Sequence, residues 1–115
     1  MKKLIAILLL TIFALSACGD KIPDHMDKTT YERGKDALEI MDNYNKGKLS
    51  KEDAEDRLDS IFKNLDKLEF DEDHYYEEIK NTGVKVSIQS FKYAIFSKGD
   101  TYSVADELRH DLELD

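Results

Sequence analysis

Apolar side chains recur at helical spacing over residues 29–68. In the first stretch, 29–45, they lie three or four residues apart, as on one face of an α-helix, with Thr29 or Thr30 placed to cap its start and Gly47 placed to end it. A second helix is expected after Ser50, a cap residue followed by acids. It carries the most regular apolar stripe of the chain: Ala54, Leu58, Ile61, Leu65 and Leu68. The two helices and their short turn predict an antiparallel hairpin.

The pattern is less regular after residue 70. Residues 71–80 read as a short helix that ends near 81–83, a run of Asn, Thr and Gly. Residues 84–96 fit either a strand or a helix, and we favour the helix because no partner strand exists elsewhere in the chain. Asp100 or Thr101 then caps a last helix. The prediction is an all-α domain over 29–115, a small bundle of three to five helices built from helical hairpins.

The first seventeen residues have a different character. Lys2 and Lys3 precede an apolar run over 4–15, and two small residues, Ser16 and Ala17, follow it. This order is typical of an export signal, and the run is shorter than the roughly 20 residues that cross a bilayer. We therefore interpret 1–17 as a signal peptide.

The sequence Leu15-Ser16-Ala17-Cys18 resembles the lipobox of bacterial lipoproteins, position by position. The resemblance implies cleavage between Ala17 and Cys18 and a diacylglyceryl group on the Cys18 thiol. The expected partner of Cys18 is therefore membrane lipid, and the protein is expected at the cell membrane, lipid-anchored and facing the outside of the cytoplasm. The acyl chains supply stable attachment. The polar residues that follow, up to 28, are interpreted as a flexible tether.

Removing 1–17 takes away two lysines and no acid, so the net charge changes from -8 to -10. No basic cluster remains after Lys3, which argues against a nucleic-acid partner because phosphate binding requires such clusters. The acidic surface instead supports an alternative function as a cation- or solute-binding lipoprotein.

Two acidic segments are candidates for a metal site. Segment 42–53 matches an EF-hand loop at its first, sixth, eighth and twelfth places, but Tyr44 and Lys46 occupy the third and fifth, which must supply oxygen ligands. In segment 71–78, His74 and Glu78 share one helical face. The segment contains no second histidine and no cysteine to complete a metal site. Motifs for nucleophilic hydrolysis and for phosphate binding are missing from the sequence. We therefore expect no catalytic residue, no metal site and no cofactor, and hence no enzyme.

Tyr75 and Tyr76 are the candidates for partner binding. Adjacent helical residues diverge by about 100°, so both cannot face one core, and tyrosine suits an interface that needs apolar area with a polar tip. The alternative is that one of them lies under the neighbouring hairpin. The turn and cap signals in 47–54 and 91–100 resemble those of small, uncharacterised helical lipoproteins of Gram-positive bacteria, which implies a fold and a location but no catalytic residues. The expected function is a non-catalytic helical module that binds an unknown envelope protein.

Overall fold

The computed structural model describes residues 21–115, which form four α-helices and one short 3-10 helix and contain no strand. The α-helices are α2 (Lys28–Asn45), α3 (Lys51–Asp66), α4 (Tyr75–Ser97) and α5 (Thr101–Asp111), and the 3-10 helix η1 (Glu72–His74) precedes α4. The predicted all-α bundle is confirmed. The signal peptide and Cys18 lie outside the described residues.

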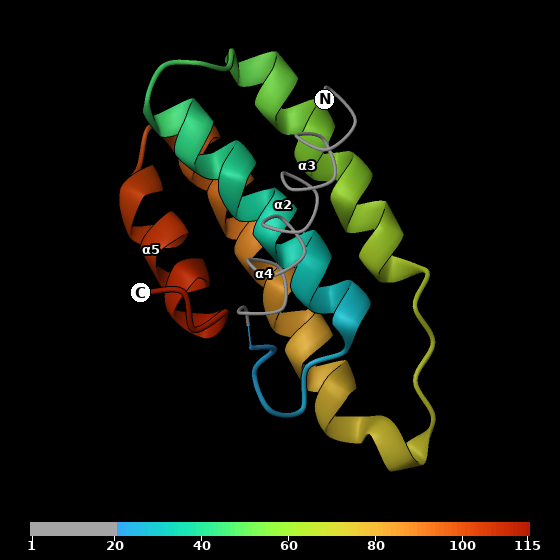
Figure 1. The fold of residues 1–115 in the computed structure, drawn as a ribbon. Coiled ribbons are helices and arrows are strands. Elements are labelled where there is room, and N and C mark those ends of the chain that lie inside the picture. Colours follow the sequence, from blue (N-terminus) through green and yellow to red (C-terminus); the bar gives the residue numbers. More distant parts are fainter. Residues whose placement is uncertain (1–20) are drawn as a thin grey trace, which may run out of the picture.

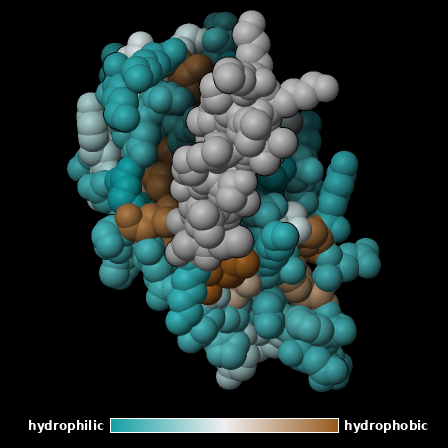
Figure 2. Space-filling model, in the orientation of Figure 1, coloured by the Kyte–Doolittle hydropathy of each residue, from teal (hydrophilic) through white to brown (hydrophobic). Residues whose placement is uncertain are grey.

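Successive helices run in opposite directions (Figure 1), and α2 and α4 form the diagonal of the bundle. Both of these helices contact α3 and α5, whereas α3 and α5 lie on opposite sides and do not touch each other. The face of the molecule seen in Figure 2 is mainly hydrophilic where its residues are described. The apolar side chains lie between the helices, and the largest fully buried ones are Phe91, Met41, Leu58, Leu65, Ile88, Leu108, Leu112 and Val84.

Side-chain caps begin three of the helices. The Ser50 hydroxyl accepts a hydrogen bond from the Asp53 N–H at 3.1 Å, and the Asp100 carboxylate accepts one from the Ser103 N–H at 2.9 Å. Both caps are at residues that the sequence predicts, because a cap depends on residues only three positions apart. At the start of α2 the cap is Asp27, whose carboxylate accepts from the N–H groups of Thr29 and Thr30, so the predicted threonine caps are wrong by two or three residues.

The turn after α2 requires a glycine. Gly47 has φ of +76°, a left-handed conformation that ends the helix as predicted.

The predicted break at 81–83 is also wrong, because α4 runs without interruption from Tyr75 to Ser97. The helical interpretation of 84–96 is confirmed. Asn81 remains in the helix because its side chain is buried and donates a hydrogen bond to the Thr30 hydroxyl at 3.1 Å, across 51 residues of sequence. A tertiary contact of this kind overrides the weak helix propensity of Asn, Thr and Gly.

Residues 21–27, which the sequence predicts to be part of a flexible tether, pack against the helical domain instead. Met26 is buried in the main core, and Ile22 packs against the same cluster. The Met26 N–H also donates to the Pro23 carbonyl at 3.2 Å. These residues therefore extend the domain, and its ordered part begins earlier than residue 29.

Candidate functional site

Tyr75 and Tyr76 lie in the first turn of α4, and both side chains are exposed, by 59% and 62%. Their ring centroids are 5.7 Å apart in an edge-to-face arrangement. Neither tyrosine is buried under the neighbouring hairpin, so that alternative is wrong. The exposure follows from the fold, because the first turns of α4 and the connection before them extend beyond the ends of α2 and α3 (Figure 1).

The tyrosine pair is close to the beginning of the described chain. The His25 ring lies against Tyr76, with ring centroids 5.2 Å apart. His25 has φ of +60°, so the backbone turns sharply there. His25 is seven positions after Cys18, a distance of at most about 25 Å in an extended chain. Tyr76 therefore lies beside a residue that is seven positions after Cys18 in the sequence.

His74, just before α4, is paired with Asp71 rather than with Glu78. The His74 Nδ1 lies 2.5 Å from the Asp71 carboxylate in an exposed position. The hydrogen bond that the protonated His74 ring donates to the Asp71 carboxylate raises the pKa of His74 and lowers the pKa of Asp71. A hollow of about 300 Å³ beside this pair is lined by apolar and acidic residues: Asp27, Leu68, Glu69, Phe70, Asp71, His74 and Glu77.

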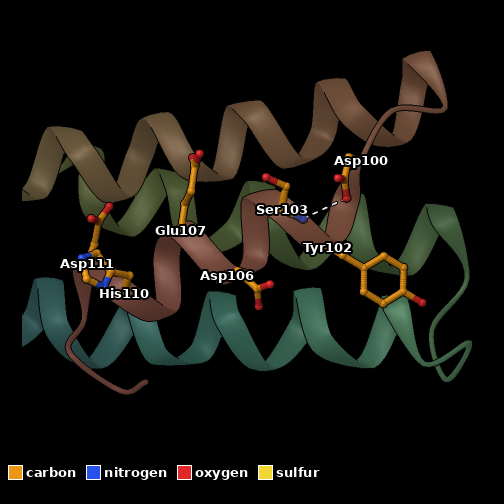
Figure 3. Close-up of a pocket in the computed structure, with 7 residues that line it drawn as sticks. All are labelled: Asp100, Tyr102, Ser103, Asp106, Glu107, His110 and Asp111. Atoms are coloured by element: carbon orange, nitrogen blue, oxygen red, sulfur yellow. Dashed lines mark hydrogen bonds between the residues drawn. The ribbon is translucent and has the colours of Figure 1, made fainter.

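A larger and more open hollow, of about 540 Å³, follows the outer side of α5 (Figure 3). Its acidic side chains do not converge: Glu107 points toward α4, whereas Asp106 points away from it (Figure 3). Two of its carboxylates already have partners, since Asp100 accepts from the Ser103 N–H and Asp106 accepts from Arg109 at 2.6 Å. This surface carries negative charge without forming a ligand cage.

Residues 21–115 contain no group of three or more histidine, cysteine, aspartate or glutamate side chains arranged to hold a metal ion. In the segment compared with an EF-hand, the first position is Asp42, and both of its carboxylate oxygens accept hydrogen bonds from Arg109. That segment forms the turn between α2 and α3, with Ser50 as the cap of the second helix.

His110, another exposed histidine, lies at the C-terminal end of α5. Its Nδ1 is 2.8 Å from the Asp115 carboxylate, and this hydrogen bond raises the pKa of His110 and lowers that of Asp115. Both groups are exposed, so the pair is a surface feature. An open hollow of about 570 Å³ lies between the His110–Asp115 pair and the N-terminal segment of the described chain. It is lined by Pro23, Asp24, His25, Lys80, His110, Asp111, Glu113 and Asp115.

The sequence interpretation missed a set of exposed apolar residues on α4. Ile79, Val86, Tyr93 and Phe96 are exposed by 46%, 56%, 69% and 76%. Their spacing is 7, 7 and 3, which is visible in the sequence only when 75–97 is taken as a single helix. The predicted break at 81–83 divided this pattern into two short pieces and concealed it.

None of the helices within residues 21–115 has the length and apolar character needed to cross a bilayer. Comparison with known proteins found no family model, no curated protein and no solved structure that matches the chain.

Proposed function

We propose that the protein is a lipid-anchored, non-catalytic helical module that binds another envelope protein through Tyr75 and Tyr76. The observation that carries this proposal is the exposure of two adjacent tyrosine rings at the end of the domain where the chain leads back to Cys18. Tyrosine offers a large contact area at a small cost in side-chain entropy, and its hydroxyl remains able to form hydrogen bonds. Such residues are enriched at protein interfaces.

The position of the pair suits a partner that is itself close to the membrane. With Cys18 acylated, His25 lies within about 25 Å of the lipid surface, and Tyr76 lies against His25. Several carboxylates and histidines of the described domain serve caps and ion pairs: Asp27 caps α2, Asp71 pairs with His74, and Asp42 pairs with Arg109. This arrangement favours binding over catalysis.

The anchoring part of the proposal is tested by the Cys18→Ser variant. We expect this variant to lose labelling by radioactive fatty acid or glycerol and to be released, or to persist as an unprocessed precursor. A processed Cys18→Ser chain that is retained in the membrane to the native extent would contradict the anchor.

The partner is tested by site-specific photo-crosslinking of the full chain in its native membrane. A photoreactive phenylalanine analogue replaces Tyr76 in one variant and Tyr102 in a matched control, because Tyr102 is equally exposed, at 63%, but lies on α5. We expect one protein to be captured from position 76 and not from position 102. Capture of the same proteins from both positions contradicts a specific site. No capture, together with a divalent cation that raises the melting temperature by several degrees, favours cation binding.

A further inference from the structure

Helix α4 carries a second stripe, mainly of apolar residues, on the side that faces away from the core. We define the α4 seam as six residues whose spacing alternates between three and four: Ile79, Thr82, Val86, Gln89, Tyr93 and Phe96. All six are exposed. Alternating spacing of three and four is the heptad pattern by which two helices wrap around each other.

The fold itself does not use this stripe. The core side of α4 is formed by a separate set of buried residues, Asn81, Val84, Ile88, Phe91, Ala94 and Ile95. A surface helix of a monomeric domain needs only one apolar side. Six large side chains of α4, including Tyr75 and Tyr76, are more than two-fifths exposed, and an unpartnered face of this kind marks an interaction site.

The charge around the seam distinguishes it from the rest of the surface. Residues 79–98 contain four lysines and no acid, in a chain that has 25 acidic residues. Lys85 and Lys92 are paired with Asp66 and Asp59 of α3, so one side of the seam is locally neutral. Two copies of this acidic chain therefore meet at the seam without placing carboxylates against one another, which would be destabilising.

We propose that the α4 seam binds the α4 seam of a second copy of this chain as a parallel, two-stranded coiled coil. In the heptad, Ile79, Val86 and Tyr93 occupy the a positions. Ile79 and Val86 are β-branched, the residue type that favours two parallel strands when it is at a. Thr82 and Gln89 occupy d positions. Their hydroxyl and amide groups both donate and accept hydrogen bonds, so each is able to pair with its own counterpart across a two-fold axis.

The parallel orientation is supported by the position of the N-terminal segment. His25 lies against Tyr76 at the beginning of α4. A parallel pair therefore brings both N-terminal segments to the same end, as two chains anchored in one bilayer require. The orientation rests on the proposed anchoring, whereas the pairing itself does not.

The exposed area is sufficient for a small specific interface. The exposed parts of the seam side chains amount to roughly 500 Å² per copy and roughly 1,000 Å² for the pair, the lower limit for such interfaces. An apolar hollow of about 300 Å³ beside the seam is lined by Phe62, Thr82, Lys85, Val86, Gln89 and Ser90, and it offers a place for a side chain of the second copy.

Gly83 flanks the seam, and a Cβ there would meet nothing within 4 Å. Its lack of a side chain has no use inside the monomer but permits close approach of a second helix.

Disulfide crosslinking of the full chain in membranes tests the pairing and its register. Residues at an a position of a parallel pair bring their Cα atoms to about the 4.4–6.8 Å that a disulfide spans. We expect Val86→Cys to form at least about fivefold more covalent dimer than Tyr102→Cys, an equally exposed position on α5, or than the native chain with only Cys18. Equal yields from the three chains overturn the parallel seam.

Light scattering of the full chain in excess detergent tests the association independently. The native chain and Tyr102→Lys are expected to have the mass of two copies, while Tyr93→Lys, which places a like charge in the seam, is expected to have the mass of one. A native chain of single-copy mass at about 100 μM, or a Tyr93→Lys chain of double mass, overturns the proposal. If the single-copy chain also shows tyrosine quenching by brominated lipid in phosphatidylglycerol vesicles, the seam contacts lipid instead. The proposed function is tested separately, by labelling at Cys18 and by capture from position 76 of a protein other than a second copy of this chain.

Discussion

Arg109 of α5 donates hydrogen bonds from Nη2 to both carboxylate oxygens of Asp42 on α2, at 2.7 and 2.6 Å. The two residues are 67 positions apart in the sequence and are about 30% exposed, at 28% and 31%. The hydrogen bonds that Arg109 donates to Asp42 raise the pKa of Arg109, because the carboxylate favours the charged guanidinium. This pair joins the first and last helices of the described domain.

We expect Asp42→Asn to lower the free energy of unfolding by about 1 kcal/mol, since a half-buried, charge-assisted contact is lost. The melting temperature should fall by roughly 4–8 °C in calorimetry or circular dichroism. Asp36→Asn is the matched control on the same helix, because Asp36 also pairs with an arginine, Arg33, but in a more exposed, local contact at 3.1 Å. Equal effects of the two substitutions would show that the tertiary pair contributes no more than a surface pair.

The buried hydrogen bond from Asn81 to Thr30 should be more costly to break. Both side chains are almost fully buried, at 2% and 0% exposure, so either one left alone is an unpaired polar group in the core. Asn81→Ala and Thr30→Val are each expected to lower the free energy of unfolding by about 1–3 kcal/mol in urea denaturation.

The double variant provides the control for this contact. If the hydrogen bond is formed, the two losses should be less than additive, with a coupling of at least about 0.5 kcal/mol. Strict additivity would mean that the two side chains do not interact.

Two glycines in similar open surroundings should respond oppositely to alanine. At Gly83, inside α4, a Cβ meets nothing within 4 Å, and Gly83→Ala is expected to stabilise the domain by about 0.5–1 kcal/mol through helix propensity. Gly47 is equally open but has φ of +76°, so Gly47→Ala should destabilise the domain by about 1 kcal/mol. Chemical denaturation of both variants measures the difference. A shift in the same direction for both would contradict the continuous α4 or the left-handed turn.

Stability should decrease between about pH 6 and pH 8 as the raised-pKa histidines lose their protons. Asp71 and Asp115 raise the pKa of His74 and His110 above the ordinary 6.5, so each pair stabilises the fold fully below that pH and loses its contribution as the pH rises through the folded value. The carboxylates behave in the opposite sense: their pKa values lie below 3.8, and their contribution is lost only in stronger acid.

Melting temperature as a function of pH measures this effect. His110→Gln and Asp115→Asn remove the same ion pair, so both variants should flatten the slope between about pH 6 and pH 8 by a similar amount. An Asp115→Asn chain with the native slope would show that His110 has a different partner in solution.

The local features of the fold were accessible from the sequence because they depend on near neighbours. The Ser50 and Asp100 caps each involve a backbone N–H three residues later, and the Gly47 turn involves one residue. The continuity of α4 was not accessible, because it depends on the contact of Asn81 with Thr30. For the same reason the exposed stripe of α4 was divided and overlooked, although both tyrosines at its start were identified as candidates.

Amino-acid order alone determines the helical character of this chain, its acidic charge and the lipobox-like residues around Cys18, since these follow from residue type and short-range spacing. Tertiary structure decided which residues join distant helices, as Arg109 joins Asp42, and that Met26 belongs to the core. It also decided which of the two apolar sides of α4 is buried. Both sides have helical spacing, and only the packing of α2, α3 and α5 around Ile88 and Phe91 leaves Val86 and Tyr93 exposed.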